Sequence, residues 1–101
     1  MLDLKQLKYF IVCAETGSVS EAAKLLYTTQ PSVSKAIKAL EEEMGIVLFE
    51  RMPRGIALTV KGREAYRYAC RIINDSRILE EMSHGNMAKY LRISLNPSSW
   101  F

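Results

Sequence analysis

One face of a predicted helix near residue 35 carries polar side chains whose chemistry suits an anionic partner. At 100° per residue, that face presents Pro31, Ser32, Lys35 and Lys38. Two arginines follow, Arg51 and Arg54, on either side of Pro53 in a predicted turn. Ammonium, guanidinium and hydroxyl groups all donate hydrogen bonds to phosphate oxygens. These residues suit contact with a phosphate backbone, but the face alone is more often typical of an ordinary solvated surface that carries Lys35 and Lys38.

Groups that could catalyse a reaction or bind a metal are few. The one histidine, His84, is placed at the predicted end of a helix, where a cation suits the helix dipole. Cys13 and Cys70 lie in separate apolar stretches, without the second pair that a zinc or redox motif needs. We expect both to fill the core or an interface, and we predict no enzymatic activity, no metal and no cofactor.

The composition is that of a small globular protein. The chain has 101 residues and a net charge of +3, from 14 basic and 11 acidic side chains. This length permits one domain with one long appended element and excludes a multidomain enzyme. The longest apolar run, residues 9–14, is too short to span a membrane, and no signal-peptide pattern precedes it. We therefore expect a cytoplasmic protein.

The positive charge is concentrated in one segment. Residues 41–50 contain four acids and no base, whereas residues 51–71 contain six bases and one acid, Glu64. The bases are Arg51, Arg54, Lys61, Arg63, Arg67 and Arg71. This distribution indicates an anionic partner more clearly than the net charge does.

Two short helices are predicted in the first 27 residues. Apolar residues recur at helical spacing from Leu4 to Thr16, and Gly17 suits a left-handed cap after them. Ser18 and Glu21 then fit a capping box, which opens a helix that ends near Tyr27.

A third helix and a two-stranded wing follow. Thr29 is the predicted N-cap, and Gly45 ends the helix. Pro31 stands in the first turn, where backbone N–H groups have no partner within the helix, so the missing N–H of proline costs nothing. The segments 46–49 and 56–59 are predicted strands, because their apolar residues flank a turn that contains proline and glycine.

One helix of about 25 residues is predicted from Val60 to His84, with Thr59 as its cap and Gly85-Asn86 after it. A seam spaced by 4, 3, 4, 3 and 4 residues comprises Ala65, Ala69, Ile72, Ser76, Leu79 and Ser83, widened by Cys70 and Ile73. This seam could pack on its own domain or pair with a second chain. We favour a homodimer, because a core of ~60 residues is marginal alone. The final alternating segment, 91–95, predicts a strand.

Two short helices joined by a tight turn are typical of a helix-turn-helix, whose second helix enters the major groove of DNA. The order of the motifs is more specific. GSVSEAAKLLYTTQPSVSKAIKALEEEMGIVLFER, followed by LTVKG, resembles the N-terminal DNA-binding domain of the LysR-type transcriptional regulators of bacteria. The resemblance implies a mainly α-helical, winged helix-turn-helix fold with a long linker helix that forms a dimer. It also implies that the chain binds double-stranded DNA.

The resemblance transfers DNA-binding roles to individual positions. Gln30 would pair with a base edge, as an amide can with adenine, and Lys35 stands where the family more often has arginine. Arg54, at the tip of the wing, would reach the backbone or the minor groove. The expected DNA-binding residues are Thr28, Thr29, Gln30, Pro31, Ser32, Ser34, Lys35, Lys38, Arg51 and Arg54.

Several of these positions also have an ordinary structural interpretation. Gln30 and Lys38 could be solvent-exposed side chains, and Ser32 could serve in capping the helix. Arg51 could pair with Glu50 or with a helix terminus. The expected dimer interface comprises Ala65, Ala69, Ile72, Ile73, Ser76 and Leu79, and a dimer implies an inverted-repeat target whose half-sites are ~34–36 Å apart.

The predicted domains are a winged helix-turn-helix over 1–59, a linker helix over 60–86 and, over 87–101, a remnant of the first strand of an effector-binding domain. We expect a fragment, with a small-molecule effector bound by the intact protein alone. A protein-binding module is the main alternative. A protein-binding module would carry aromatic or leucine side chains on the outer face of the third predicted helix. This chain has Ser32, Lys35 and Lys38 there instead. RNA binding is disfavoured, because the sequence shows no evident set of exposed aromatic side chains on which bases could stack.

Overall fold

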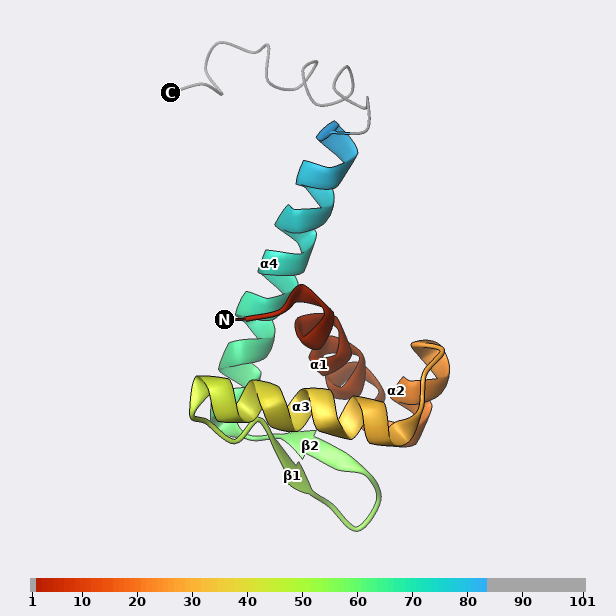
Figure 1. Ribbon diagram of the computed structural model, residues 1–101. Helices are drawn as coiled ribbons and strands as arrows, with labels where there is room; N and C mark the ends of the chain where they lie inside the picture. Colours follow the sequence, from red (N-terminus) through yellow and green to blue (C-terminus); the bar gives the residue numbers. More distant parts are fainter. Residues whose placement is uncertain (1, 84–101) are drawn as a thin grey trace.

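The computed structural model describes residues 2–83. The elements are α1 (Leu4–Thr16), α2 (Val19–Leu25), α3 (Gln30–Met44), β1 (Phe49–Arg51), β2 (Ile56–Leu58) and α4 (Val60–Ser83). In Figure 1, α1, α2 and α3 form the body, the β1–β2 hairpin projects below it, and α4 rises away from it. This arrangement confirms the predicted mainly α-helical, winged fold. No helix within residues 2–83 has the length and apolar character needed to cross a membrane.

The core is formed by one apolar side of each helix, and the apolar side chains of the hairpin pack against it. Phe10 of α1 is 1% exposed, and its ring meets those of Phe49 and Tyr66 edge to face at 5.5 and 6.5 Å. Burial removes apolar surface from water, and edge-to-face ring geometry adds to that gain. The buried residues are Leu7, Phe10, Cys13, Ala22, Ala23, Val33, Ile37, Leu40, Leu48 and Ala69.

The helix caps follow the predicted chemistry, except that the capping box is half formed: Ser18 N donates to the Thr16 hydroxyl, and the Glu21 carboxylate pairs with Lys24. The Ser18 and Thr29 hydroxyls accept hydrogen bonds from the backbone N–H groups three residues later, at 3.2 and 3.3 Å. Gly17 and Gly45 end α1 and α3 in the left-handed conformation, with φ of 67° and 69°. The second helix ends at Leu25, slightly before the predicted position.

The first strand of the wing starts later than predicted. β1 begins at Phe49 rather than at residue 46, and Arg51 lies in this strand rather than in the turn. The reason is that Leu48 is buried in the core, where its N–H donates to the Glu41 carboxylate at 2.8 Å. The strands are antiparallel, with Phe49 opposite Leu58 and Arg51 opposite Ile56.

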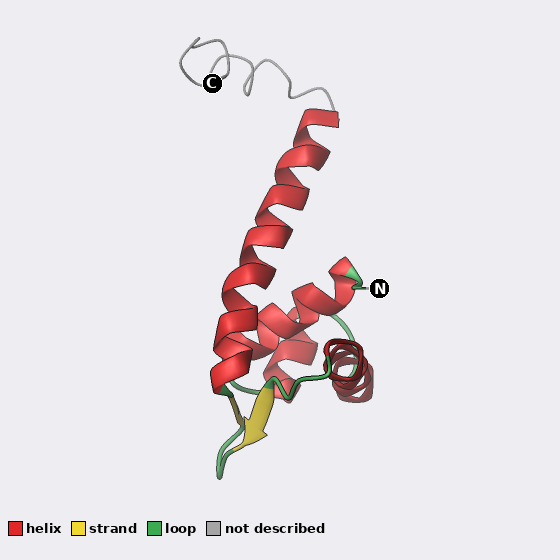
Figure 2. Ribbon diagram, turned by 90° about the vertical axis from the view of Figure 1, so that its left-hand side faces the viewer, coloured by secondary structure: helices red, strands yellow, loops and turns green. Residues whose placement is uncertain are grey.

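The long helix starts at the base of the wing. The Thr59 hydroxyl accepts from Gly62 N at 2.9 Å, which confirms the predicted cap, and it donates to the Val47 carbonyl. The first half of α4 packs against α1, and Figure 2 shows its second half extending beyond the body. The predicted end near Gly85 and the predicted strand over 91–95 lie outside the described residues.

The turn between α2 and α3 places a tyrosine in a conformation that favours glycine. Tyr27 has a φ of 54°, and its side chain is 97% exposed. The turn is closed by a hydrogen bond from Thr28 N to the Ala23 carbonyl, the Schellman arrangement that follows many helices.

We predict that Tyr27→Gly raises the free energy of unfolding by about 1 kcal/mol, because it relieves left-handed strain and loses almost no packing. Gly45→Ala is the matched control. An added methyl would meet no atom within 4 Å there, so strain alone should lower stability by a similar amount. Urea denaturation measures both changes. A Tyr27→Gly variant less stable than wild type would contradict this account.

Candidate nucleic-acid interface

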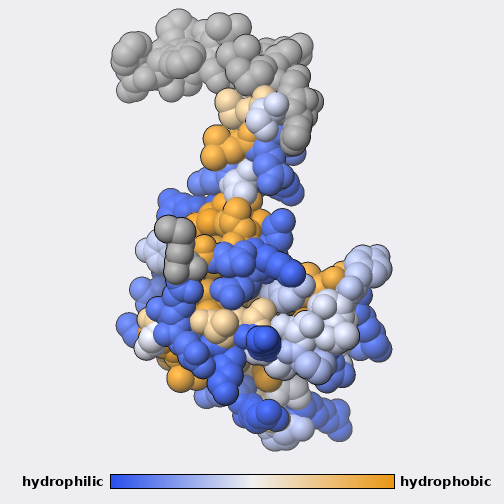
Figure 3. Space-filling view, viewed as in Figure 1, coloured by the Kyte–Doolittle hydropathy of each residue, from blue (hydrophilic) through white to orange (hydrophobic). Residues whose placement is uncertain are grey.

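The outward face of α3 is polar and is open to solvent. Val33 and Leu40 on the opposite side are buried, which fixes the rotation of the helix about its own axis. Pro31, Lys35 and Lys38 are consequently exposed. In Figure 3, hydrophilic residues predominate over the lower body and the wing, whereas apolar residues gather along the middle of α4.

A groove of about 460 Å³ separates α3 from the wing. It brings together predicted residues from two parts of the sequence: Gln30, Ser34 and Lys38 from α3, and Arg51 from β1. Two acidic residues, Glu41 and Glu50, line the same groove. A strip of amide, hydroxyl and basic groups therefore runs from the outward face of α3 to the wing.

A second groove lies on the other flank of α3. Thr28, Ser32 and Lys35 line it together with the start of α1. Lys5 of α1 stands over the Tyr9 ring, 5.7 Å from its centre, and both residues line this groove. None of the predicted site residues belongs to α1, because the position of α1 beside α3 depends on the packing of the core.

The wing tip carries Arg54 away from the body. Arg54 is exposed in a turn that is closed by a hydrogen bond from Met52 N to the Gly55 carbonyl, at 3.0 Å. Gly55 has a φ of 81°, and a Cβ there would overlap the Gly17 carbonyl oxygen. The same oxygen accepts from Ile56 N at 3.0 Å, so the wing is tied to the corner between α1 and α2.

Some predicted contact residues already have partners within the chain. The Thr29 hydroxyl accepts from Ser32 N and donates to the Ser32 hydroxyl at 2.9 Å, which agrees with the capping interpretation of Ser32. Gln30, Ser34, Lys35 and Lys38 are exposed. Within residues 2–83, Arg51 forms no ion pair with Glu50.

The predicted dimer seam on α4 divides into two stripes. Ala69 is 2% exposed in the core of its own chain, and Ala65 and Ile73 pack against that core. The prediction was therefore wrong for Ala69, because periodicity cannot tell which stripe faces α1. Ile72 and Leu79 are 40% and 67% exposed, and Ser76 is half-buried.

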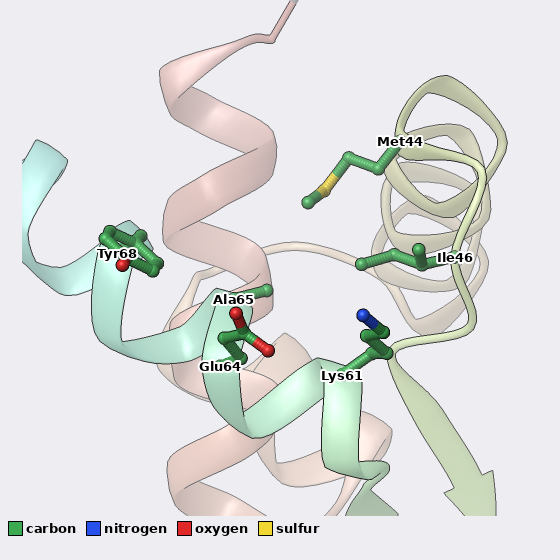
Figure 4. A pocket seen from close by; sticks show the side chains of 6 residues that line it. All are labelled: Met44, Ile46, Lys61, Glu64, Ala65 and Tyr68. Carbon is green, nitrogen blue, oxygen red and sulfur yellow. The ribbon is translucent and has the colours of Figure 1, made fainter.

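A shallow pocket lies between the end of α3 and the start of α4 (Figure 4). Its wall is largely apolar and includes the Met44 and Tyr68 side chains, which are 36% and 53% exposed. Ala65 lies at the pocket as well, next to Glu64. The pocket continues the exposed apolar stripe of α4 onto the body.

The described part of the chain offers little for catalysis. Burial raises the pKa of the Cys13 thiol to about 11, so this thiol stays protonated and weakly reactive. Within residues 2–83, no three histidine, cysteine, aspartate or glutamate side chains gather to hold a metal ion.

Similar proteins are bacterial regulators. The HTH-type transcriptional regulator ClcR of Pseudomonas putida is 40% identical over 77 residues, which cover 76% of this chain and 26% of ClcR. TcbR of Pseudomonas sp. strain P51 is 44% identical over 72 residues, covering 71% of this chain and 24% of TcbR. The matched region is thus about a quarter of these relatives.

Solved structures with similar folds include protein–DNA complexes. The crystal structure of the CbnR_DBD-DNA complex matches with a TM-score of 0.79 and 38% identity, over 85% of this chain and 99% of that one. The BenM_DBD/catB site 1 DNA complex matches with a TM-score of 0.79 and 35% identity, over 82% and 93%. Residues 4–63 match the family described as bacterial regulatory helix-turn-helix protein, lysR family. This chain therefore belongs to the LysR family of bacterial helix-turn-helix regulators.

Proposed function

We propose that this chain binds duplex DNA as the DNA-binding domain of a transcriptional regulator, with α3 in the major groove and the wing beside it. The observation that carries the proposal is the exposed polar face of α3, continued by a groove to Arg51 on the wing. A helix fits the width of the major groove, where base edges are distinguishable. The DNA complexes of the similar CbnR and BenM domains support DNA as the partner.

Individual roles follow from position and chemistry. Gln30, at the first position of α3, would pair with a base edge, while Lys35 and Lys38 would reach bases or phosphates on the two sides of the helix. Arg54, at the wing tip, would contact the backbone or the minor groove. Thr28 and Thr29 would meet a phosphate near the positive end of the helix dipole.

Two copies would pair through α4. Its first half is basic, with Lys61, Arg63, Arg67 and Arg71 against Glu64, and its second half is acidic, with Asp75, Glu80 and Glu81 against Arg77. An antiparallel pair places each basic half beside an acidic half. With the two-fold axis at Ile72, Leu79 of one copy faces Ala65 of the other, at the pocket in Figure 4. A two-fold dimer favours an inverted-repeat target.

Selection from a pool of random DNA duplexes at two salt concentrations tests this function directly. We expect a dimer to retain an inverted repeat, with affinity that falls steeply as salt rises. The absence of retention at low salt would contradict DNA binding. Binding of a small-molecule effector by a longer polypeptide is part of the same proposal and is not tested by this selection.

We predict that Gln30→Ala weakens binding to the selected duplex by about 1–3 kcal/mol and leaves binding to random duplex nearly unchanged, because a base-edge contact is lost. Fluorescence anisotropy with both duplexes measures the difference. An equal loss on both would make Gln30 a residue that positions the protein on the backbone instead.

We predict that Arg54→Ala weakens binding to every sequence and reduces the slope of log K against log salt by about 1, because one phosphate contact is lost. Arg77→Ala is the matched control, since it removes the same charge from the far half of α4, where Arg77 donates to Asn74. An unchanged salt slope in Arg54→Ala would exclude a phosphate contact by this residue.

We predict that the double variant Ile72→Glu, Leu79→Glu is monomeric in sedimentation, because it places four carboxylates in one apolar stripe of the dimer. Val47→Glu is the control, since Val47 is 64% exposed in the loop before β1. A double variant that remained dimeric would refute the α4 interface.

A further inference from the structure

An acidic side chain occupies the groove that the proposed function assigns to DNA. Glu41 lies on α3 beside Ser34 and Lys38, in the groove between that helix and the wing. A negative charge in this place repels phosphate, so electrostatics alone would predict that its removal strengthens DNA binding.

The Glu41 carboxylate is engaged with the backbone that enters the wing. Oε2 accepts from Leu48 N at 2.8 Å and from Phe49 N at 3.4 Å, and the side chain is half-buried. These bonds span seven and eight residues and join the recognition helix to the first residue of β1. Hydrogen bonds from N–H groups to an ionised carboxylate are stronger than those between neutral groups.

A second acid in the same groove provides the comparison. Glu50 also lines the groove, but its side chain is exposed and makes no hydrogen bond or ion pair within the part of the chain that the structure describes. The two carboxylates thus share a location and a charge, and they differ in whether they hold the backbone.

Other hydrogen bonds that attach the wing lie on different elements, and the Phe49 ring packs against Phe10 of α1. Ile56 N donates to the Gly17 carbonyl at 3.0 Å, and Thr59 N donates to the Leu48 carbonyl at 3.0 Å. Those two bonds fix the hairpin to the corner between α1 and α2 and to its own base. Glu41 connects the hairpin to the helix whose face would read the bases, so it bears directly on the separation between α3 and Arg51.

We propose that Glu41 is a positioning residue for DNA binding: it holds the wing at the distance from α3 at which both contact one duplex. The inference rests on the proposed DNA-binding function. By charge alone, both acids of the groove should weaken DNA binding. On this proposal Glu50 does so, whereas Glu41 strengthens binding.

The experiment compares Glu41→Gln, Glu41→Ala, Glu50→Gln and Glu50→Ala in the full 101-residue chain. Three quantities are measured for each: the free energy of unfolding in urea, hydrogen exchange at the Leu48 and Phe49 amides, and affinity for the selected and random duplexes. Binding is measured well below the unfolding transition, so that every variant tested is folded.

We expect both Glu50 variants to bind DNA about two- to fivefold more tightly at low salt, the usual size of an exposed charge effect. We expect Glu41→Ala to bind the selected duplex at least about tenfold more weakly, with faster exchange at Leu48 and Phe49. Glu41→Gln keeps one carbonyl acceptor and should fall between wild type and Glu41→Ala in both exchange and affinity.

A purely structural Glu41 gives a different pattern. It would lower the free energy of unfolding in Glu41→Ala and yet tighten DNA binding as the Glu50 variants do, and that result would overturn the proposal. If Glu41→Ala does not fold, the Glu41→Gln variant provides the test. Tighter DNA binding by Glu41→Gln together with faster exchange at Leu48 would also overturn the proposal. Failure of wild type to bind either duplex would refute the DNA-binding function itself, whereas the exchange data report on the tether without DNA.

Discussion

The packing of Phe10 against two other rings holds the three parts of the molecule together. Phe10 belongs to α1, Phe49 to the wing and Tyr66 to α4, and the Tyr66 hydroxyl adds a hydrogen bond to Glu15 of α1 at 3.1 Å. Because Phe10 is buried, a shift of any one element opens apolar surface in the other two. The helix-turn-helix, the wing and α4 therefore pack on one core, which brings the polar groups on their surfaces near one another.

Local chemistry was predictable from the sequence, since the determinants of a helix end lie within a few residues. Ser18, Thr29 and Thr59 cap their helices as their positions predicted, and Gly17 and Gly45 end theirs. The start of the wing was not predictable in the same way. Residues 46–48 have apolar side chains suited to a strand. The Leu48 N–H instead donates a hydrogen bond to the carboxylate of Glu41, seven residues earlier in the sequence. Propensity cannot detect such a partner.

The candidate site divides along the same line. Exposure of Lys35 and Lys38 followed from helical periodicity, because Val33 and Leu40 determine which side of α3 is buried. The contribution of α1 to the second groove and the division of the α4 seam both depend on tertiary packing. A repeat of apolar residues indicates that one side of a helix packs against another element. The burial of Ala69 in the core shows which stripe of α4 packs within its own chain.

The geometry of α4 has a mechanical consequence. Its 24 residues form an uninterrupted rod about 36 Å long, anchored at one end where Gly62 lies against the Leu48 carbonyl. The far end projects beyond the body (Figure 2). Because the helix is uninterrupted from Val60 to Ser83 and its near half packs on the body, the direction in which its far end points is set at the junction of helix and wing.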